Sequence, residues 1–282
     1  MQFNCRIADT TGWPVNCFGL KVVAGKQRSE AQKGVAGAKR SKKIFMSKLF
    51  KQCPVIEEIL VGRSAYTLGG DKISVHSDIG LAHAEALYET VLRERPAVVL
   101  EVGMAFGVSS LSILAALRDI GQNGKLLSID PLQTPDWKGC GLASIARAGL
   151  KDRHEMHEDY DYKVLPRLLE SGRKLDFAYI DGWHTFDYTL LDWWYVDRML
   201  KVGGIAAFND CSWPAVDKAI QFVITHRKYT ELDVGLPLPR RRKQELLRRL
   251  SLGAKKLPLP DRDRYFKKDA DWEPKWDFYA PF

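Results

Sequence analysis

The sequence predicts an α/β protein with a doubly wound, mostly parallel sheet and helices on both faces. Segments with strand and helix patterns alternate between residues 79 and 234, as they do in chains that build parallel sheets. The apolar run Ala97–Leu100 ends in Glu101, and a glycine turn, Gly103-x-x-x-Gly107, leads directly into a segment of helical spacing. A buried strand, a tight loop and a helix N-terminus in this order form a ligand crevice in open α/β sheets.

Apolar periodicity and turn residues assign the elements in chain order. The predicted helices are Ile79–Arg93, Val108–Ile120, Pro135–Ala148, Tyr162–Glu170, Thr185–Leu200 and Val216–Arg227. The predicted strands after the first are Lys125–Ile129, Arg153–His157, Asp176–Ile180, Ile205–Phe208 and Tyr229–Val234. Gly121 closes the second helix, and the Gly203-Gly204 pair closes the fifth. We expect the aromatic segment Tyr265–Phe282 to add an antiparallel edge strand and a pocket wall.

Composition divides the chain into two parts. Residues 1–45 mix Gly, Lys, Ala, Ser and Gln without a period and predict a flexible basic N-terminal tail. The texture changes at Met46, which is an alternative to Met1 as the start of translation. Residues 46–282 are long enough for one α/β domain, with a basic insertion over about residues 237–260. A tail and an insertion of this kind often mediate self-association, so a homo-oligomer is one expectation for this protein.

The net charge of +8 is unevenly distributed. Residues 1–52 and 236–268 each carry a net charge of +9, whereas residues 53–235 carry −7, and an acidic body disfavours a nucleic-acid substrate. No apolar run approaches the ~20 residues of a membrane span. Five scattered cysteines without a Cys-x-x-Cys pair predict a reducing compartment and no zinc site. We therefore expect a cytoplasmic protein without a membrane span, while the basic N-terminus leaves a transit peptide open.

Acidic residues follow the predicted strands at the edge where an open α/β sheet binds its ligands. Glu101, Asp130 and Asp159 end the first three strands. A carboxylate at Asp130 can accept both hydroxyl groups of a ribose, and Asp159 lies where an adenine edge would fall. Each acid alone has an alternative interpretation as a helix cap. Three of them in register, together with the glycine loop, are much less expected by chance.

A second polar cluster follows the fourth and fifth strands. Asp181 ends the fourth strand, and Asn209-Asp210 ends the fifth. Because adjacent parallel strands lie ~4.8 Å apart, these oxygen ligands would converge on one Mg²⁺ ion, which would activate an alcohol. The alternative is that Asp181 and Asp210 cap the helices that follow. His184 is the candidate general base, because its ordinary pKa of about 6.5 lets it accept a proton near neutral pH; the alternative is a structural histidine.

Aromatic residues late in the chain are candidates for substrate walls. Trp213, Trp272, Trp276 and Phe278 fall in predicted loops. The Trp193-Trp194-Tyr195 cluster lies inside a predicted helix instead, and aromatic residues at helical spacing are typical of core packing.

The motifs that carry a family resemblance occur in order within residues 79–222. They are Glu101-Val-Gly-Met-Ala-Phe-Gly107-Val-Ser109, Ser128-Ile-Asp130-Pro131, Glu158-Asp159-Tyr160, Tyr179-Ile-Asp181-Gly-Trp-His184, and Val202-Gly203-Gly204-Ile205 followed by Asn209-Asp210. This set resembles class I S-adenosylmethionine-dependent methyltransferases, whose fold is Rossmann-like. Within that class it is similar to small bacterial O-methyltransferases related to macrolide-sugar and catechol-type enzymes. The chain departs from them in its Asn-Asp order and in having Trp183 where sugar enzymes often have another Asp.

The resemblance implies a role for each matching residue. The cofactor-binding residues would be Glu101, Gly103, Gly107, Ser109, Asp130, Asp159 and Asp181. The two glycines would line the methionine part of the cofactor, and Glu101 would orient its ammonium group directly or through water. Asp130 would hold the ribose and Asp159 the adenine. Ser109 would touch the carboxylate, or it would be only an N-terminal residue of its helix.

The expected function is transfer of a methyl group from S-adenosylmethionine to a hydroxyl group of a small molecule or sugar. His184 and Asp181 would be catalytic, with Mg²⁺ on Asp181, Asn209 and Asp210 as a second cofactor. One alternative is a methyltransferase with a nitrogen or carbon acceptor. The other is a non-catalytic module that binds an adenosine cofactor and acts on a polyanion through Arg240–Arg249. The acidic body and the histidine at the crevice favour the enzyme.

Overall fold

The computed structural model describes residues 47–236 and 263–282. The helices in these ranges are α1 (Lys48–Gln52), α2 (Pro54–Leu60), α3 (Leu81–Glu94), α4 (Val108–Ile120), α5 (Cys140–Arg147), a short 3₁₀ helix (Lys151–Arg153), α6 (Asp161–Glu170), α7 (Phe186–Met199) and α8 (Pro214–His226). The strands are β1 (Ser64–Tyr66), β2 (Lys72–Ser74), β3 (Val98–Val102), β4 (Lys125–Ile129), β5 (His154–His157), β6 (Leu175–Ile180), β7 (Leu200–Phe208), β8 (Tyr229–Leu232) and β9 (Arg264–Lys268). None of the helices described is both long enough and apolar enough to cross a membrane. The predictions for residues 1–45, Met46 and the insertion over 237–260 lie outside the described residues.

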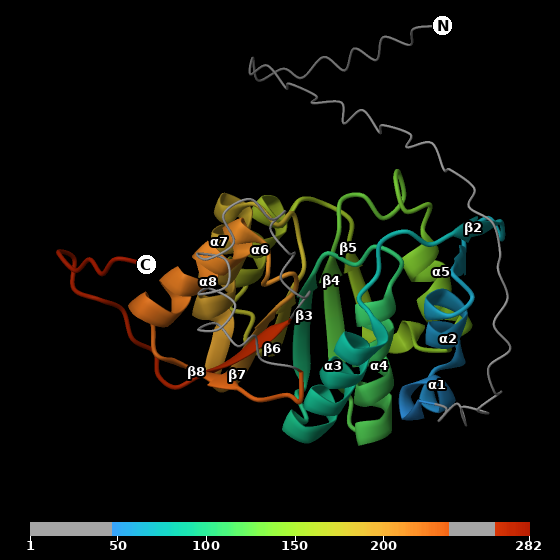
Figure 1. Ribbon diagram of the computed structural model, residues 1–282, viewed down its shortest axis with the longest axis horizontal. Helices are drawn as coiled ribbons and strands as arrows, with labels where there is room; N and C mark the ends of the chain where they lie inside the picture. The colour runs from blue at the N-terminus through green and yellow to red at the C-terminus, as the bar shows by residue number, and fades with distance from the viewer. Residues whose placement is uncertain (1–46, 237–262) are drawn as a thin grey trace, which may run out of the picture. The chain divides into compact units, whose positions relative to one another are not determined.

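Seven strands form one sheet in the order β5-β4-β3-β6-β7-β9-β8, and β1 pairs with β2 in a separate sheet. At the centre, β3 runs parallel to both β4 and β6. Farther out, β5 is parallel to β4 and β7 is parallel to β6. Only β9 runs against its neighbours, β7 and β8, within this described sheet. The arrangement confirms the predicted doubly wound, mostly parallel α/β fold (Figure 1).

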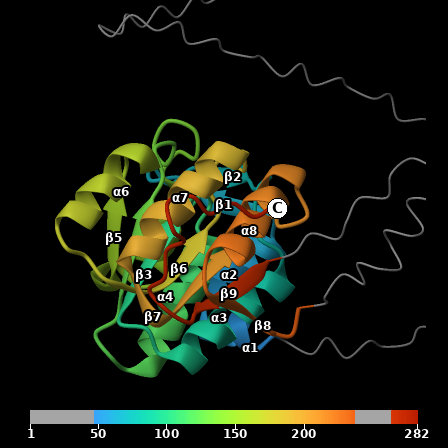
Figure 2. The same cartoon turned by 90° about the vertical axis from the view of Figure 1, so that its left-hand side faces the viewer.

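Alternate residues of the central strands face two separate layers of helices (Figures 1 and 2). Val99 and Phe177 belong to a core that they share with α1 to α5. Leu100 and Ala178 belong to a second core, shared with α6, α7 and α8. Of the predicted Trp193-Trp194-Tyr195 core cluster, Trp193 is fully buried in this second core and Tyr195 packs against it, whereas Trp194 is 39% exposed. A strand that is covered on both faces is apolar along nearly its whole length, as β3 is.

The position of β9 differs from the predicted edge strand. It is antiparallel, as expected, but it lies between β7 and β8, with Phe266 opposite Ala206 on one side and Glu231 on the other. Phe266 is fully buried, so the interior position covers an apolar strand. The edge is formed instead by β8, none of whose residues is buried, and a polar edge protects a sheet from pairing with other chains.

The junction between α7 and β7 also differs from its prediction. The helix ends at Met199 and the strand begins at Leu200, so Gly203 and Gly204 lie within β7 rather than closing a helix. A Cβ on Gly204 would lie 2.9 Å from the carbonyl oxygen of Asp176. The glycine therefore allows β7 to approach β6 closely, where the pairing shifts register between Leu175 and Phe177.

Residues 47–78 form elements that were not predicted from the sequence. The helices α1 and α2 join the core on the α3–α4 side of the sheet, and the hairpin of β1 and β2 leads into residues 75–79. The predicted helix from Pro135 begins only at Cys140, because Lys138 and Gly139 adopt left-handed backbone conformations. Both departures are local, and neither alters the sheet.

Candidate active site

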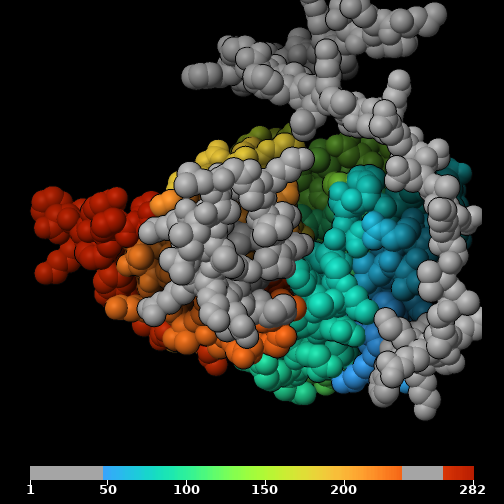
Figure 3. Space-filling model, in the orientation of Figure 1, coloured from blue at the N-terminus to red at the C-terminus, as the bar shows by residue number. Residues whose placement is uncertain are grey.

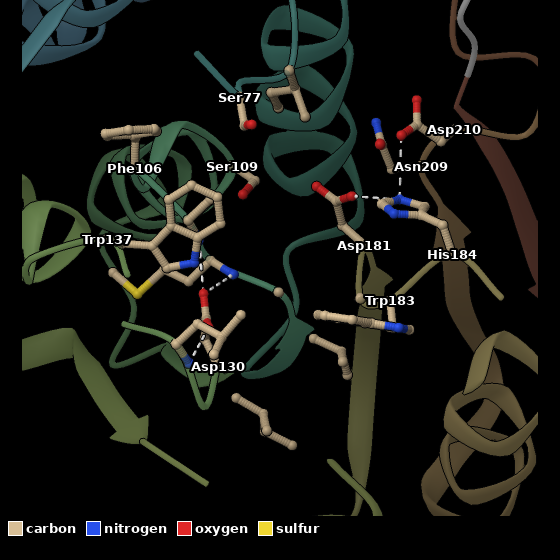
Figure 4. Close-up of a pocket in the computed structure, with 18 of the residues that line it drawn as sticks. Ser77, Phe106, Ser109, Asp130, Trp137, Asp181, Trp183, His184, Asn209 and Asp210 are labelled. Atoms are coloured by element: carbon tan, nitrogen blue, oxygen red, sulfur yellow. Dashed lines mark hydrogen bonds and ion pairs between the residues drawn. The ribbon is translucent and has the colours of Figure 1, made fainter. Parts of the chain in front are cut away.

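A cavity of about 800 Å³ opens at the carboxyl ends of β3, β4, β6 and β7. This is the edge at which open α/β sheets bind ligands. The loops after these strands supply much of the lining, and residues 76–79 close one side. The polar side chains gather in two groups, one at Asp130 and the other around His184 (Figure 4).

The loop between β3 and α4 lies directly against the end of β6. Gly103 has a φ of +84°, and a Cβ at this position would lie 1.9 Å from the carbonyl oxygen of Asp181. Gly107 has a φ of +86°, and its Cβ would lie 3.0 Å from the Cα of Gly141. Both positions need glycine. The loop consequently presents bare backbone, and the first turn of α4, to the cavity.

Asp130 fastens this loop to the end of β4 (Figure 4). Its Oδ2 accepts hydrogen bonds from the backbone N–H groups of Met104 at 3.1 Å and Ala105 at 2.9 Å. Its Oδ1 accepts one from Leu132 at 2.9 Å. The buried amide of Gln133 adds a second link by donating to the Ala105 carbonyl at 3.0 Å. Asp130 lines the cavity, and its Oδ1 retains acceptor capacity for a ligand hydroxyl.

Glu101 lies within β3, just before the loop, and has no exposed surface. Ser110 and Ser128 donate hydrogen bonds to its Oε2 at 2.5 Å and 2.6 Å. Burial raises the pKa of the Glu101 carboxyl to about 7, although hydrogen bonds from serine hydroxyls act in the opposite direction. Glu101 is absent from the cavity lining. It supports the loop from behind.

Ser109 and Asp159, both predicted to bind the cofactor, differ in whether they line the cavity. Ser109 lies in the first turn of α4 and lines the cavity. Asp159 is outside the lining, because its carboxylate pairs with Lys163 at 3.3 Å and with Arg167 at 2.8 Å on α6. The wall that follows β5 is formed instead by residues 160 and 161. Of the predicted cofactor residues, Asp159 and Glu101 are therefore both outside the cavity lining.

Asp181, His184 and Asp210 form the second polar group of the cavity, and their side chains point toward one another (Figure 4). The Nε2 atom of His184 lies 3.1 Å from Asp181 Oδ1 and 3.3 Å from Asp210 Oδ2. The three side chains are between 19% and 21% exposed, and their candidate ligand atoms all lie within 4.8 Å of one another. The cluster has the size of a cation site, and it can equally stabilise an imidazolium between two carboxylates.

The backbone supports a functional interpretation of this cluster. His184 has a φ of +56° and Asp210 a φ of +50°, a left-handed region that residues with side chains seldom adopt. Such strain concentrates at functional sites. The alternative of helix capping finds no support, because α7 and α8 have Thr185 and Trp213 at their N-cap positions and neither has a side-chain cap hydrogen bond.

Asn209 lines the cavity beside this cluster, and its amide nitrogen donates to Asp263 at 2.8 Å. Asp263 is buried immediately before β9, accepts a second hydrogen bond from Tyr179 at 2.9 Å and lies 3.2 Å from His83. A carboxylate can only accept hydrogen bonds, so the contact fixes the orientation of the Asn209 amide. Asp263 was missed from the sequence because it lies 54 residues from Asn209 and no local motif marks it.

Aromatic side chains form much of the cavity mouth. Trp183 and Trp213 are 62% and 51% exposed, and the Trp213 ring lies 5.2 Å from the ring of His184. Phe106 and Trp137, with ring centroids 5.3 Å apart, line the loop side of the same cavity. Trp213 therefore lines the cavity, as the sequence predicted.

The C-terminal segment does not form the predicted pocket wall. Residues after β9, drawn in red in Figure 3, project on the side of α8. Phe278 packs on His226 of α8, with ring centroids 5.5 Å apart, and Trp276 is 97% exposed. Neither these two residues nor Trp272 line the cavity. The prediction is wrong because the chain turns away from the strand ends after β9.

A family model described as a methyltransferase domain matches residues 100–211. Caffeoyl-CoA O-methyltransferase 1 of Eucalyptus globulus and Caffeoyl-CoA O-methyltransferase of Eucalyptus gunnii are each 27% identical to this chain over 120 residues. These matches cover 40% of this chain and 44% of each relative. The chain thus aligns with less than half the length of these curated relatives.

Solved structures share the fold at low sequence identity. The O-methyltransferase from Bacillus cereus in complex with SAH has a TM-score of 0.54 at 12% identity, and the match covers 80% of this chain and 94% of that one. Cofactor-bound Rv0187 from MTB has a TM-score of 0.51 at 14% identity, with 68% and 82% covered.

The family match assigns a methyltransferase domain to residues 100–211, and the mostly parallel seven-stranded sheet with helices on both faces is the Rossmann-like fold that the sequence predicts. The match runs from Leu100 in β3 to Cys211 after β7. It therefore includes every strand end that opens into the cavity. The curated relatives and the Bacillus cereus protein are O-methyltransferases by name.

Proposed function

We propose that this protein transfers the methyl group of S-adenosylmethionine to an oxygen atom of a small molecule or sugar. The observation that carries the proposal is that one cavity contains both the glycine loop with Asp130 and the cluster of Asp181, His184 and Asp210. The first group suits a nucleoside cofactor with an amino-acid part, and the second suits removal of a proton from an acceptor. The names of the relatives support oxygen as the acceptor atom.

The cofactor would occupy the loop side of the cavity. Gly103 and Gly107 leave room for its methionine part, whose carboxylate would face Ser109 and the first N–H groups of α4. Glu101 would act on the ammonium group from behind the loop, directly or through water. Asp130 would accept the ribose hydroxyl groups with Oδ1. Asp181, at the end of β6, would border both the cofactor and the acceptor.

His184 would act as the general base. The carboxylates of Asp181 and Asp210 accept a hydrogen bond from Nε2–H, which leaves Nδ1 as the nitrogen that takes up a proton. The acceptor oxygen attacks the methyl carbon in line with the C–S bond while its proton passes to His184. The electron pair of the C–S bond stays on sulfur, so the sulfonium becomes a thioether. The two carboxylates then stabilise the imidazolium.

The same oxygen atoms suit a hard divalent cation, so we also propose a test for Mg²⁺. Asp181, Asp210 and the Oδ1 of Asn209 would hold the ion, which when bound supplies Lewis-acid activation of an acceptor hydroxyl. A cation and an imidazolium would compete for the same carboxylates. Methyl transfer that persists in EDTA supports the histidine base, and methyl transfer that requires Mg²⁺ supports the ion.

Binding and turnover test the proposal in sequence. Calorimetric titration with S-adenosylhomocysteine (SAH) should show one site, with and without Mg²⁺. A panel of phenols and sugars would then be assayed for methylation. His184→Gln is expected to bind SAH as the unmodified protein does, while kcat falls about 10²- to 10⁴-fold. The control is His157→Gln, which removes a histidine outside the cavity lining. Folded protein that does not bind SAH would reject the cofactor assignment, and N- or C-methylated products would reject the oxygen acceptor.

A further inference from the structure

A buried carboxylate lies behind Asn209, one of the residues that line the cavity. Asp263, which immediately precedes β9, has a side chain with no exposed surface. Tyr179 of β6 donates a hydrogen bond to its Oδ2 at 2.9 Å, and the amide of Asn209 donates to its Oδ1 at 2.8 Å. His83 of α3 lies 3.2 Å from the same Oδ1. Three elements therefore meet the start of β9 at this carboxylate.

The charge of Asp263 is compensated by hydrogen bonds rather than by a basic side chain. No lysine or arginine in the described part of the chain pairs with it. Burying a carboxylate costs free energy even when hydrogen bonds satisfy it, and an apolar residue at the same place would avoid that cost. A fully bonded polar network fixes one arrangement of its members. The presence of a carboxylate here therefore indicates that one of its partners needs a fixed orientation.

Asn209 is the partner of Asp263 that lines the cavity. Its backbone N–H donates to the Ile180 carbonyl at 3.0 Å, so the pairing of β7 with β6 holds its main chain. A carboxylate only accepts hydrogen bonds, so the amide nitrogen must face Asp263, and the carbonyl oxygen Oδ1 is the atom left for the cavity. Asn209 lies beside the second polar group of the cavity (Figure 4). Its carbonyl is thus a fixed hydrogen-bond acceptor next to the proposed general base.

We propose that Asp263 is a positioning residue that holds the Oδ1 atom of Asn209 toward the cavity, where this oxygen accepts a hydrogen bond from an O–H or N–H group of the methyl acceptor. The inference rests on the proposed function, because it requires an acceptor beside His184. The reacting hydroxyl group gives its proton to His184, so the donor to Asn209 is a second group of the acceptor. A reversed amide would present its own N–H groups, and two donors would then face each other. Asp263 therefore favours acceptors with a donor near the reacting hydroxyl group, although it does not touch them.

The first test exchanges the two side chains. Asn209→Asp alone places two carboxylates at hydrogen-bond distance, so kcat/KM for the acceptor should fall at least about 100-fold. In the double variant, Asn209→Asp with Asp263→Asn, the introduced amide donates to the introduced carboxylate and accepts from Tyr179. An oxygen atom again faces the cavity, and kcat/KM should return to within about tenfold of the unmodified value. The assays use the phenol or sugar that is methylated fastest in the panel described for the proposed function.

The second test uses Asp263→Asn alone, which keeps the shape of the side chain. The introduced amide has one oxygen, which cannot accept from both Tyr179 and Asn209, so the Asn209 amide loses its fixed orientation. We expect KM for the acceptor to rise about tenfold, while Kd for SAH is unchanged because the glycine loop builds the cofactor side. The matched control is Asp197→Asn. Asp197 is also buried and accepts from Tyr229 at 2.7 Å, but it lies outside the cavity lining, so its substitution should lower Tm without changing KM.

The outcomes separate the inference from the function on which it rests. Thermal unfolding confirms that each variant is folded before its kinetics are compared, and Asp263→Asn alone decides if the exchanged variants do not fold. An unchanged KM for the acceptor in Asp263→Asn, or a folded double variant that regains Tm but not kcat/KM, would overturn the inference while the unmodified protein still supports the proposed function. Unmodified protein that binds no SAH, or that methylates no member of the panel, would instead reject the proposed function.

Discussion

Gly103 is the residue at which the loop and the end of β6 approach most closely, and this leads to a prediction. Gly103→Ala must displace the Asp181 carbonyl, since a Cβ would lie 1.9 Å from it. We expect the free energy of unfolding to fall by more than ~2 kcal/mol and the affinity for SAH to fall at least about tenfold, because both sides of the cavity move. Urea unfolding and calorimetry measure the two effects.

Gly149 provides the matched control for this substitution. Its φ of +68° resembles that of Gly103, but a Cβ there would have no neighbour within 4 Å. Gly149→Ala therefore introduces the backbone strain alone, about 1 kcal/mol, and should leave SAH binding unchanged. Equal losses in the two variants would contradict the importance of the close approach.

The raised pKa of Glu101 leads us to expect that the stability of the folded protein depends on pH. Its pKa is raised from 4.5 to about 7 in the folded protein, so the folded state keeps a proton that the unfolded chain releases. This contribution to stability is full below about pH 4.5 and is lost as the pH rises through about 7. The urea midpoint of the unmodified protein should therefore decline from pH 5 to pH 8 more than that of Glu101→Gln, whose amide does not titrate. Parallel profiles would contradict the shift.

The sequence predicted those site residues that directly follow an apolar strand. Asp130 and Asp181 line the cavity because each directly follows an apolar strand, and that pattern is visible in the sequence. Asp159 comes two residues after β5, but its carboxylate pairs with Arg167 of α6, so a position near a strand end was insufficient. Asp263 contacts Asn209 and Tyr179, which are distant from it in the sequence, and no local pattern marks such contacts.

Among the elements, β9 makes a contribution to stability that can be measured. Phe266 is fully buried between β7 and β8 and belongs to the α6–α8 core. Phe266→Ala should lower the free energy of unfolding by ~3–5 kcal/mol through the cavity that it leaves. Lys267→Ala, at the next and only partly buried position of the strand, should change it by less than ~1 kcal/mol. Urea unfolding followed by circular dichroism distinguishes the two, and similar losses would argue against an interior β9.

The elements themselves were predictable to different degrees. β3 is an apolar run followed by Gly103, and α4 is an apolar helical pattern between Gly107 and Gly121, so their limits follow from local sequence. The order of β8 and β9 depends on a pairing between Ala206 and Phe266, sixty residues apart in the sequence, which periodicity does not encode. The glycines of β7 were misassigned because glycine marks close backbone approach as well as helix ends.

At the scale of the whole molecule, the cavity joins loops that follow four different strands. A ligand that bridges them should stabilise the folded state as a unit. SAH at about 100 times its Kd should add ~2.7 kcal/mol, which corresponds to a rise of roughly 5–10 °C in Tm for a domain of this size. Differential scanning calorimetry measures the shift. Asp130→Ala should abolish it, and a rise that persists in that variant would place the ligand elsewhere.

The position of β9 also imposes an order on the synthesis of the protein. Within the described sheet, β8 pairs only with β9, and β9 fills the gap beside β7. A ribosome completes β7 and β8 before the residues of β9 emerge, so a nascent chain must keep the outer edge of β7 unpaired while translation proceeds from Leu232 to Arg264. An open edge of this kind invites pairing with other chains. Chaperone protection would therefore matter most during that interval, and it would cease to be needed once Phe266 has docked.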